Sequence, residues 1–174
     1  MRRKWVNNRC FSKRFAIEIF HHSGGKLGDQ NLINDFVSVA QQKSDSGYFR
    51  GVTVLVILGS NDKGSPESLG RNMEEFVKRL LLIQKTKVIV STIIPRRHDS
   101  KKGESKVIES VVQQLQSSYD NVFILKLGKI LNKNIGWMQG GSIWLWDGVH
   151  LCEQAVSLIV DEIFKCFFKF VSYS

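Results

Sequence analysis

The fold is decided by the run Val52-Thr53-Val54-Leu55-Val56-Ile57-Leu58, which leads directly into Gly59-Ser60-Asn61-Asp62. All but one of the seven residues in the run are apolar, and most are β-branched. Such a run predicts a strand that is buried on both faces, because a strand at the surface of a sheet alternates apolar and polar residues. Strands buried on both faces are typical of a parallel sheet with helices on either side, so the sequence predicts the α/β class.

The rest of the chain repeats an apolar run followed by an amphipathic pattern. Ser65 is a plausible helix N-cap, and Pro66 suits the first helical position. Further strands are expected at residues 16–20, 88–94 and 122–125, and helices at about 31–42, 65–85, 107–115 and 151–170. Because ligands bind beyond the carboxyl ends of parallel strands, we expect the chemistry in the turns after Phe20, Leu58, Ile94 and Leu127.

Length and composition favour a single globular domain over residues 1–174. The chain has 174 residues, 43% of them hydrophobic, and shows neither a repeat nor a linker. Its longest apolar run is far shorter than the ~20 residues that span a bilayer, so no membrane span is expected.

Cysteine and histidine usage points away from disulfides and metals. The 3 cysteines are an odd number without a Cys-x-x-Cys pair, which indicates neither a disulfide framework nor a zinc site. With no secretory signal, a reducing, cytoplasmic location is expected. His21 and His22 share no spacing with a carboxylate or cysteine, so we interpret them as polar turn residues, and we expect no metal or other cofactor.

Positive charge is concentrated at the start of the chain. Residues 1–26 hold seven lysines and arginines and one acid, a net +6 out of the +9 of the whole chain. Three interpretations stay open: a mitochondrial-type presequence, electrostatic binding of nucleic acid, and a solvated basic helix before the first strand, which we favour.

Three segments carry candidate chemistry. The side-chain amide of Asn61, at the end of the most buried strand, is suited to donate to a developing oxyanion. Asp147 precedes His150 by three residues, a spacing in which a carboxylate can orient a general-base imidazole. The Gly24-Gly25 pair allows close approach of backbone to a substrate. Taken singly, each is also ordinary turn or helix-cap chemistry.

In this order, the segments resemble the SGNH (GDSL-type) hydrolase family of esterases and lipases over almost the whole chain. The resemblance rests on Leu58-Gly59-Ser60-Asn61-Asp62, on Trp146-Asp147-Gly148-Val149-His150-Leu151 and, more loosely, on Ser23-Gly24-Gly25. It implies a flavodoxin-like three-layer α/β/α sandwich and a Ser-His-Asp esterase that needs no cofactor. It also implies that Asn61 and Gly24, or Gly25 in its place, form the oxyanion hole, and that His150 is the general base oriented by Asp147.

The chain departs from the family at the nucleophile. The family's serine lies in a Gly-Asp-Ser turn after a first strand, and this sequence contains no Gly-Asp-Ser. The resemblance therefore implies an N-terminally truncated domain that lacks the first, central strand, with the remainder of the following helix at Arg3 to about Phe11. Ser12, Ser23 and Ser60 do not match the family position, so the nucleophile is unknown and the chain is expected to be inactive or nearly so.

A second hypothesis is a binding module without catalysis. It would bind a protein partner, or nucleic acid through the basic N-terminus. SGNH-like domains also occur in retroelement proteins, which is an analogy in favour of nucleic acid. The sequence does not indicate an oligomeric state.

Overall fold

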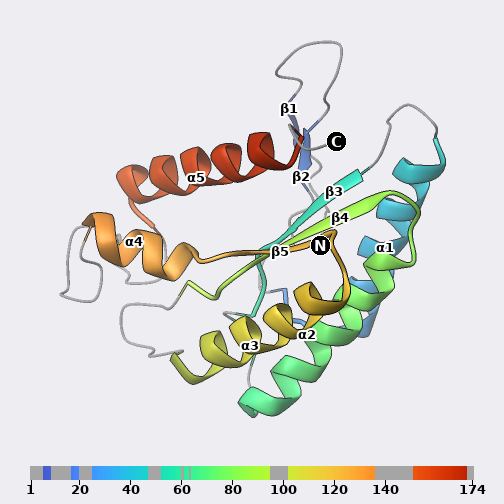
Figure 1. The fold of residues 1–174 in the computed structure, drawn as a ribbon, viewed down its shortest axis with the longest axis horizontal. Helices are drawn as coiled ribbons and strands as arrows, with labels where there is room; N and C mark the ends of the chain where they lie inside the picture. Colours follow the sequence, from blue (N-terminus) through green and yellow to red (C-terminus); the bar gives the residue numbers. More distant parts are fainter. Residues whose placement is uncertain are drawn as a thin grey trace.

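The structure, a computed structural model, describes residues 6–8, 17–19, 25–46, 52–59, 61–62, 64–94, 102–135 and 151–171. Helices cover both faces of a parallel sheet, so the fold is the expected three-layer α/β sandwich of the flavodoxin-like kind. Figure 1 shows the strands in the middle, with α4 and α5 on one side and α1, α2 and α3 on the other.

The sheet contains β3 (Val52–Val56), β4 (Thr86–Ser91) and β5 (Val122–Leu125) in the order β3-β4-β5. Both pairings are parallel, with Val54 opposite Val88 and Ile89 opposite Phe123. All three carboxyl ends therefore meet at one edge, where ligands bind in open α/β sheets.

Alternate residues of the strands enter two separate cores. One face, with Val54, Val88 and Val122, packs against α1 (Gln30–Asp45), α2 (Pro66–Leu81) and α3 (Lys102–Ser118). The other face, with Ile89 and Leu125, packs against α4 (Leu127–Ile135) and α5 (Glu153–Val171). The uninterrupted apolar runs in the sequence are explained by this burial on both faces.

The predicted helices and strands are found within a few residues of their expected bounds. Ser65 is the N-cap of α2, with Pro66 at its start, and its Oγ accepts from the backbone N–H of Ser68 at 3.2 Å. The strand expected at 88–94 is β4 and begins earlier, at Thr86. Helix α4 was not expected: the predicted turn after Leu127 is wrong, because the chain enters this helix directly after β5.

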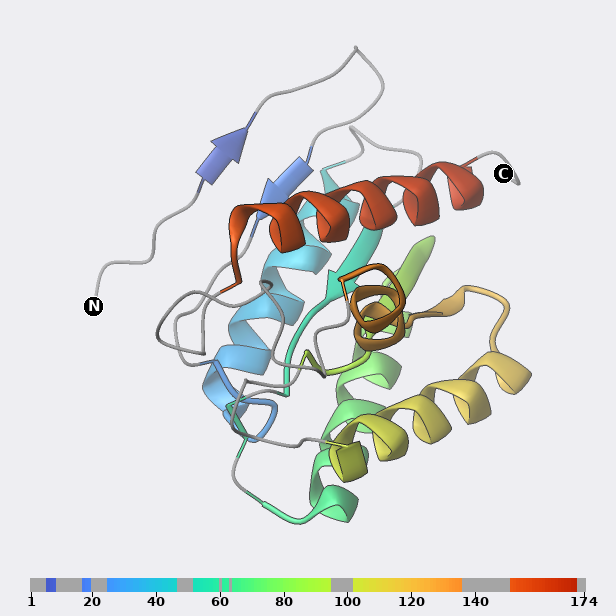
Figure 2. The same ribbon diagram turned by 90° about the vertical axis from the view of Figure 1, so that its left-hand side faces the viewer.

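Two predictions for the N-terminal part are wrong. Instead of a helix from Arg3 to about Phe11, Val6–Asn8 form strand β1. The strand expected at 16–20 is β2 (Ile17–Ile19), which pairs antiparallel with β1 and not within the parallel sheet (Figure 2). Strand backbone groups need hydrogen-bond partners, and a segment close by in the chain can supply them in the antiparallel direction.

No helix in the described part of the chain is both long and apolar enough to cross a membrane.

Candidate functional site

The turn after β3 begins at Gly59, which has a φ of 108°. A residue with a side chain rarely adopts this backbone conformation. A Cβ at this position would also lie 3.0 Å from Ile93 Cδ1, so the turn is pressed against the loop after β4. The backbone N–H of Asp62 donates to the carbonyl of Gly59 at 3.3 Å and closes the turn. The glycine in this motif is therefore required by both conformation and packing.

The carboxylate of Asp62 connects this turn to the loop before α1. Its Oδ2 accepts from the backbone N–H of Leu27 at 3.1 Å, and its Oδ1 accepts from that of Gly28 at 3.2 Å. Leu27 is buried in the core, and this packing fixes the position of its backbone N–H. We call this pair of bonds the Asp62 clamp. It joins two segments that are more than thirty residues apart in the chain.

Asn61, the predicted oxyanion-hole residue, lies beside the clamp. Its Nδ2 donates to the carbonyl of Gly25 at 3.4 Å, and its side chain is partly exposed. The bond to Gly25 orients the amide group, whose nitrogen carries two hydrogens. Gly25 itself is buried. The structure thus brings Asn61 and the second glycine of the pair together.

The carboxyl ends of β4 and β5 are tied together next to this turn. Thr92 N–H donates to the carbonyl of Leu125 at 2.9 Å, and Gly128 N–H, in the first turn of α4, donates to Thr92 Oγ1 at 3.3 Å. Lys126 follows β5 and pairs with Glu109 of α3. The hydrogen bond from Lys126 lowers the pKa of Glu109, against an opposing effect of burial. This edge of the sheet is therefore held by polar contacts as well as by the two cores.

Most of the predicted catalytic residues lie outside the described residues. This holds for Gly24, Asp147 and His150, and for the serines weighed as nucleophiles, Ser12, Ser23 and Ser60. Their roles stay predictions. Within the described ranges, no three histidine, cysteine, aspartate or glutamate side chains gather in a group that could hold a metal ion.

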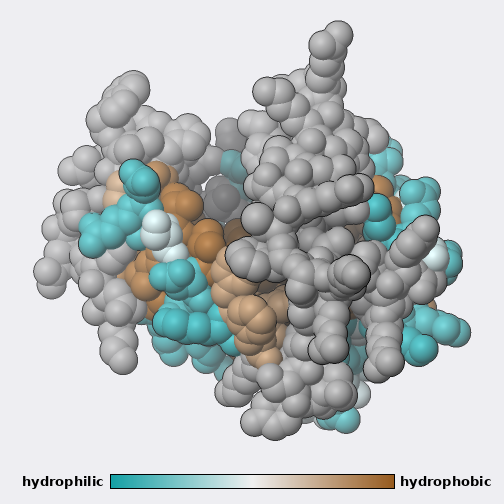
Figure 3. Space-filling model, turned by 90° about the horizontal axis from the view of Figure 1, so that it is seen from above, coloured by the Kyte–Doolittle hydropathy of each residue, from teal (hydrophilic) through white to brown (hydrophobic). Residues whose placement is uncertain are grey.

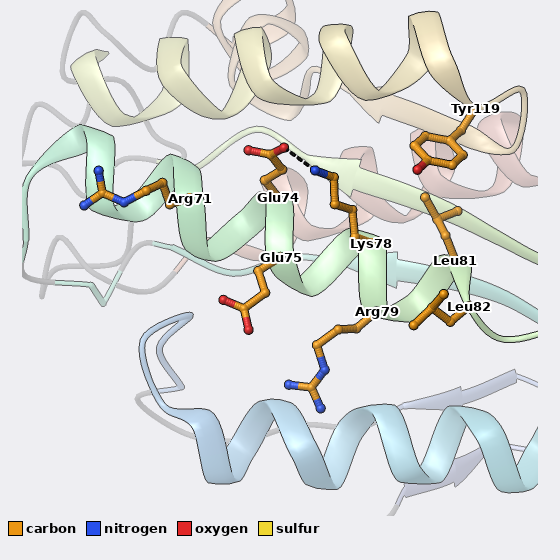
Figure 4. A pocket seen from close by; sticks show the side chains of 8 residues that line it. All are labelled: Arg71, Glu74, Glu75, Lys78, Arg79, Leu81, Leu82 and Tyr119. Atoms are coloured by element: carbon orange, nitrogen blue, oxygen red, sulfur yellow. Dashed lines mark hydrogen bonds and ion pairs between the residues drawn. The ribbon is translucent and has the colours of Figure 1, made fainter.

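A groove of about 570 Å³ lies elsewhere, along the outer side of α2. It contains none of the predicted site residues. Figure 4 shows its polar side chains spread along α2, with Glu74 accepting from Lys78, and Tyr119 and Leu82 at one end. Charged side chains spread along one helix surface do not make a defined ligand site, so we place the candidate site at the carboxyl edge of the sheet.

Asp62 is the residue that the sequence reasoning missed. It lies within the motif Leu58 to Asp62, but the sequence alone assigns it no role. A carboxylate next to an asparagine in a strand-end turn was the available signal. Its partners, Leu27 and Gly28, could not be identified without the three-dimensional structure.

Comparison with known proteins supports the fold. No protein-family model matches the chain, and no curated protein matches it. Among solved structures, a Clostridium thermocellum family 3 carbohydrate esterase is similar, with a TM-score of 0.60 and 19% sequence identity. The match covers 83% of this chain and 65% of that chain, so the present chain spans about two thirds of the esterase's length. At this identity the similarity shows the fold alone, and it agrees with the three-layer α/β sandwich described above.

Proposed function

We propose that this chain is an SGNH-type ester hydrolase domain and that Asn61 belongs to the oxyanion hole of an acyl-transfer site. The observation that carries the proposal is the Asp62 clamp, which holds the Asn61 turn against the glycine loop at the carboxyl edge of the sheet. Oxyanion stabilisation needs donors that are fixed before the reaction begins, and the clamp supplies such a fixed position. The similarity to a carbohydrate esterase fold agrees with this function.

In the proposed mechanism, a carboxylic ester binds with its carbonyl oxygen toward Asn61. The Nδ2 of Asn61 and a backbone N–H of Gly24 or Gly25 donate to this oxygen as negative charge develops on it. His150 takes the proton of the attacking nucleophile, and Asp147 accepts from the imidazole Nδ1–H and fixes its tautomer. The loss of one oxyanion donor lowers kcat by about 10²–10³ in sites of this kind.

The nucleophile is not assigned. The sequence holds no Gly-Asp-Ser, and no other serine matches the family position. We therefore propose that this 174-residue chain has little or no ester turnover of its own, because a His–Asp pair without a nucleophile retains only the small catalysis due to oxyanion stabilisation and binding.

Hydrolysis of p-nitrophenyl acetate by the wild-type chain and by the variants Asn61→Ala and His150→Ala tests this proposal. Asn31→Ala, on the exposed side of α1, is the matched control. We expect all four proteins to remain at the buffer rate. Turnover that falls with both site variants but not with Asn31→Ala would establish ester hydrolysis and identify a nucleophile within the chain, which would correct the expected inactivity. Turnover indifferent to both site variants would count against the proposed site.

A further inference from the structure

Helix α5 has an apolar stripe on its outer face in addition to its buried inner face. Inward, Ala155 and Ile159 are buried against the α4–α5 side of the sheet. Outward, four apolar side chains recur every fourth residue, and three of them are strongly exposed: Val156 at 46%, Val160 at 41% and Phe168 at 57%. The fourth, Phe164, is partly buried and stacks on Phe168 with ring centroids 6.2 Å apart.

The exposed fractions of Val156, Val160 and Phe168 place the stripe at the molecular surface. Helix α5 lies at the upper left of Figure 1, and the view from above in Figure 3 shows hydrophobic side chains beside hydrophilic ones in this part of the surface. A contiguous apolar stripe rimmed by polar residues marks an interaction site more often than scattered exposed apolar residues do.

The charged residues beside the stripe change sign along the helix. Asp161 and Lys165 are both exposed and lie one turn apart, near the middle of α5. Asp161 lies toward the N-terminus and Lys165 toward the C-terminus, so the flank of the stripe is negative and then positive. Lys165 Nζ also donates to Glu162 at 2.6 Å within the same helix, but an ammonium group has three hydrogens to donate.

We propose that this face binds a second copy of the same chain, with the two α5 helices packed antiparallel about a two-fold axis near residue 162. In this arrangement each small side chain meets a large one: Val156 faces Phe168 of the second copy, and Val160 faces Phe164. Asp161 of each copy then lies beside Lys165 of the other. A parallel arrangement would place like charges together, so charge complementarity favours the antiparallel pair of two copies.

The geometry of helix packing agrees with this arrangement. A spacing of four residues forms the ridge that interdigitates with the same ridge of a second helix in the commonest class of helix packing. A two-fold interface is self-complementary, as the Val–Phe matching requires. The stripe runs from Val156 to Phe168, which are about 18 Å apart along the helix at 1.5 Å per residue. A contact along one stripe of a single helix is short beside standard interfaces, which bury ~800 Å² per partner, so we expect a weak dimer that forms at high protein concentration.

Sedimentation equilibrium over a wide range of protein concentration tests the proposal. We expect the wild-type chain to shift from monomer toward dimer as concentration rises, and Val160→Glu to remain monomeric. Leu82→Glu is the matched control, because Leu82 is 85% exposed but lies after α2, away from α5. We expect this control to associate as the wild type does.

An exchange of the charges at Asp161 and Lys165 tests the antiparallel orientation. Both side chains are exposed, so we expect these variants to fold even if Val160→Glu does not fold. Asp161→Lys and Lys165→Asp should each weaken association several-fold, and the double variant should restore it. Circular dichroism checks that α5 remains helical in each variant. A monomer at all concentrations, or association that ignores both Val160→Glu and the charge exchange, would overturn the proposal. The proposal would also be overturned if the chain never dimerises but binds phosphatidylcholine vesicles, and if Val160→Glu abolishes that binding.

Discussion

Removal of the Asp62 carboxylate should loosen the candidate site and destabilise the protein measurably. In Asp62→Ala, the backbone N–H groups of Leu27 and Gly28 lose acceptors at 3.1 and 3.2 Å. A hydrogen bond to a charged group contributes about 1.5–3 kcal/mol, and partial exposure of this pair favours the low end for each bond. Allowing for rehydration of the exposed Gly28 N–H, we expect a loss of about 2–3 kcal/mol in the free energy of unfolding. For a chain of this size, that corresponds to a fall in Tm of about 5–10 °C.

Urea denaturation measures the loss, and amide hydrogen exchange locates it. Exchange should accelerate at Leu27 and Gly28 before it does in β4. The matched control is Asp29→Ala, which also removes a carboxylate that accepts from two backbone N–H groups, those of Asn31 and Leu32, but acts only at the N-cap of α1. It should cost about 1 kcal/mol and accelerate exchange at Asn31 and Leu32 instead. Unchanged exchange at Leu27 and Gly28 in Asp62→Ala would refute the clamp.

Three further predictions concern the turn, the ion pair and the N-terminus. Gly59→Ala should lower the free energy of unfolding by about 1–3 kcal/mol in urea titrations, because Gly59 has a φ of 108° and a Cβ there would contact Ile93. The control Gly103→Ala, on the exposed first turn of α3, should not destabilise the chain. The pKa of Glu109 is lowered from 4.5 by Lys126, so Glu109 stabilises the fold above pH 4.5 and loses this contribution as the pH falls through its lowered value. The difference in unfolding free energy between wild type and Glu109→Gln should therefore shrink in acid titrations, and a constant difference would contradict this assignment. If the basic N-terminus binds nucleic acid, fluorescence anisotropy should show binding to single-stranded DNA that weakens steeply with salt. The binding should disappear when Arg2, Arg3 and Lys4 are changed to Gln. No binding at low salt would contradict this second hypothesis.

Local patterns were sufficient for most of the sheet and its helices. The run from Val52 predicted β3 because burial on both faces leaves an uninterrupted apolar signal in the sequence. Ser65 and Pro66 predicted the start of α2 because capping depends on neighbours only three residues away. Helix α4 gave no such signal. It is short and has a glycine in its first turn, and it is stabilised by burial of Leu127 and Leu131 against the sheet.

The failures of sequence reasoning concern contacts between distant residues. A strand can be predicted from its own residues, but its partner cannot, so β2 was expected in the parallel sheet although it pairs with β1. The same limit applies to the candidate site. Asn61 was predicted from its motif, whereas the structural role of Asp62 depends on Leu27 and Gly28, which fold next to it from another part of the chain.

The most direct test of the oxyanion hole is an NMR titration of the chain with methyl methylphosphonate, a tetrahedral anion that resembles the intermediate of ester hydrolysis. The proposal predicts saturable shifts of the Asn61 side-chain amide, with smaller shifts at Leu27 and Gly28, none at the side chain of Asn31, and weaker binding in Asp62→Ala. Equal, unsaturated shifts at Asn61 and Asn31, or no shift at Asn61 at any concentration, would contradict the assignment of this edge of the sheet as the site of an ester hydrolase.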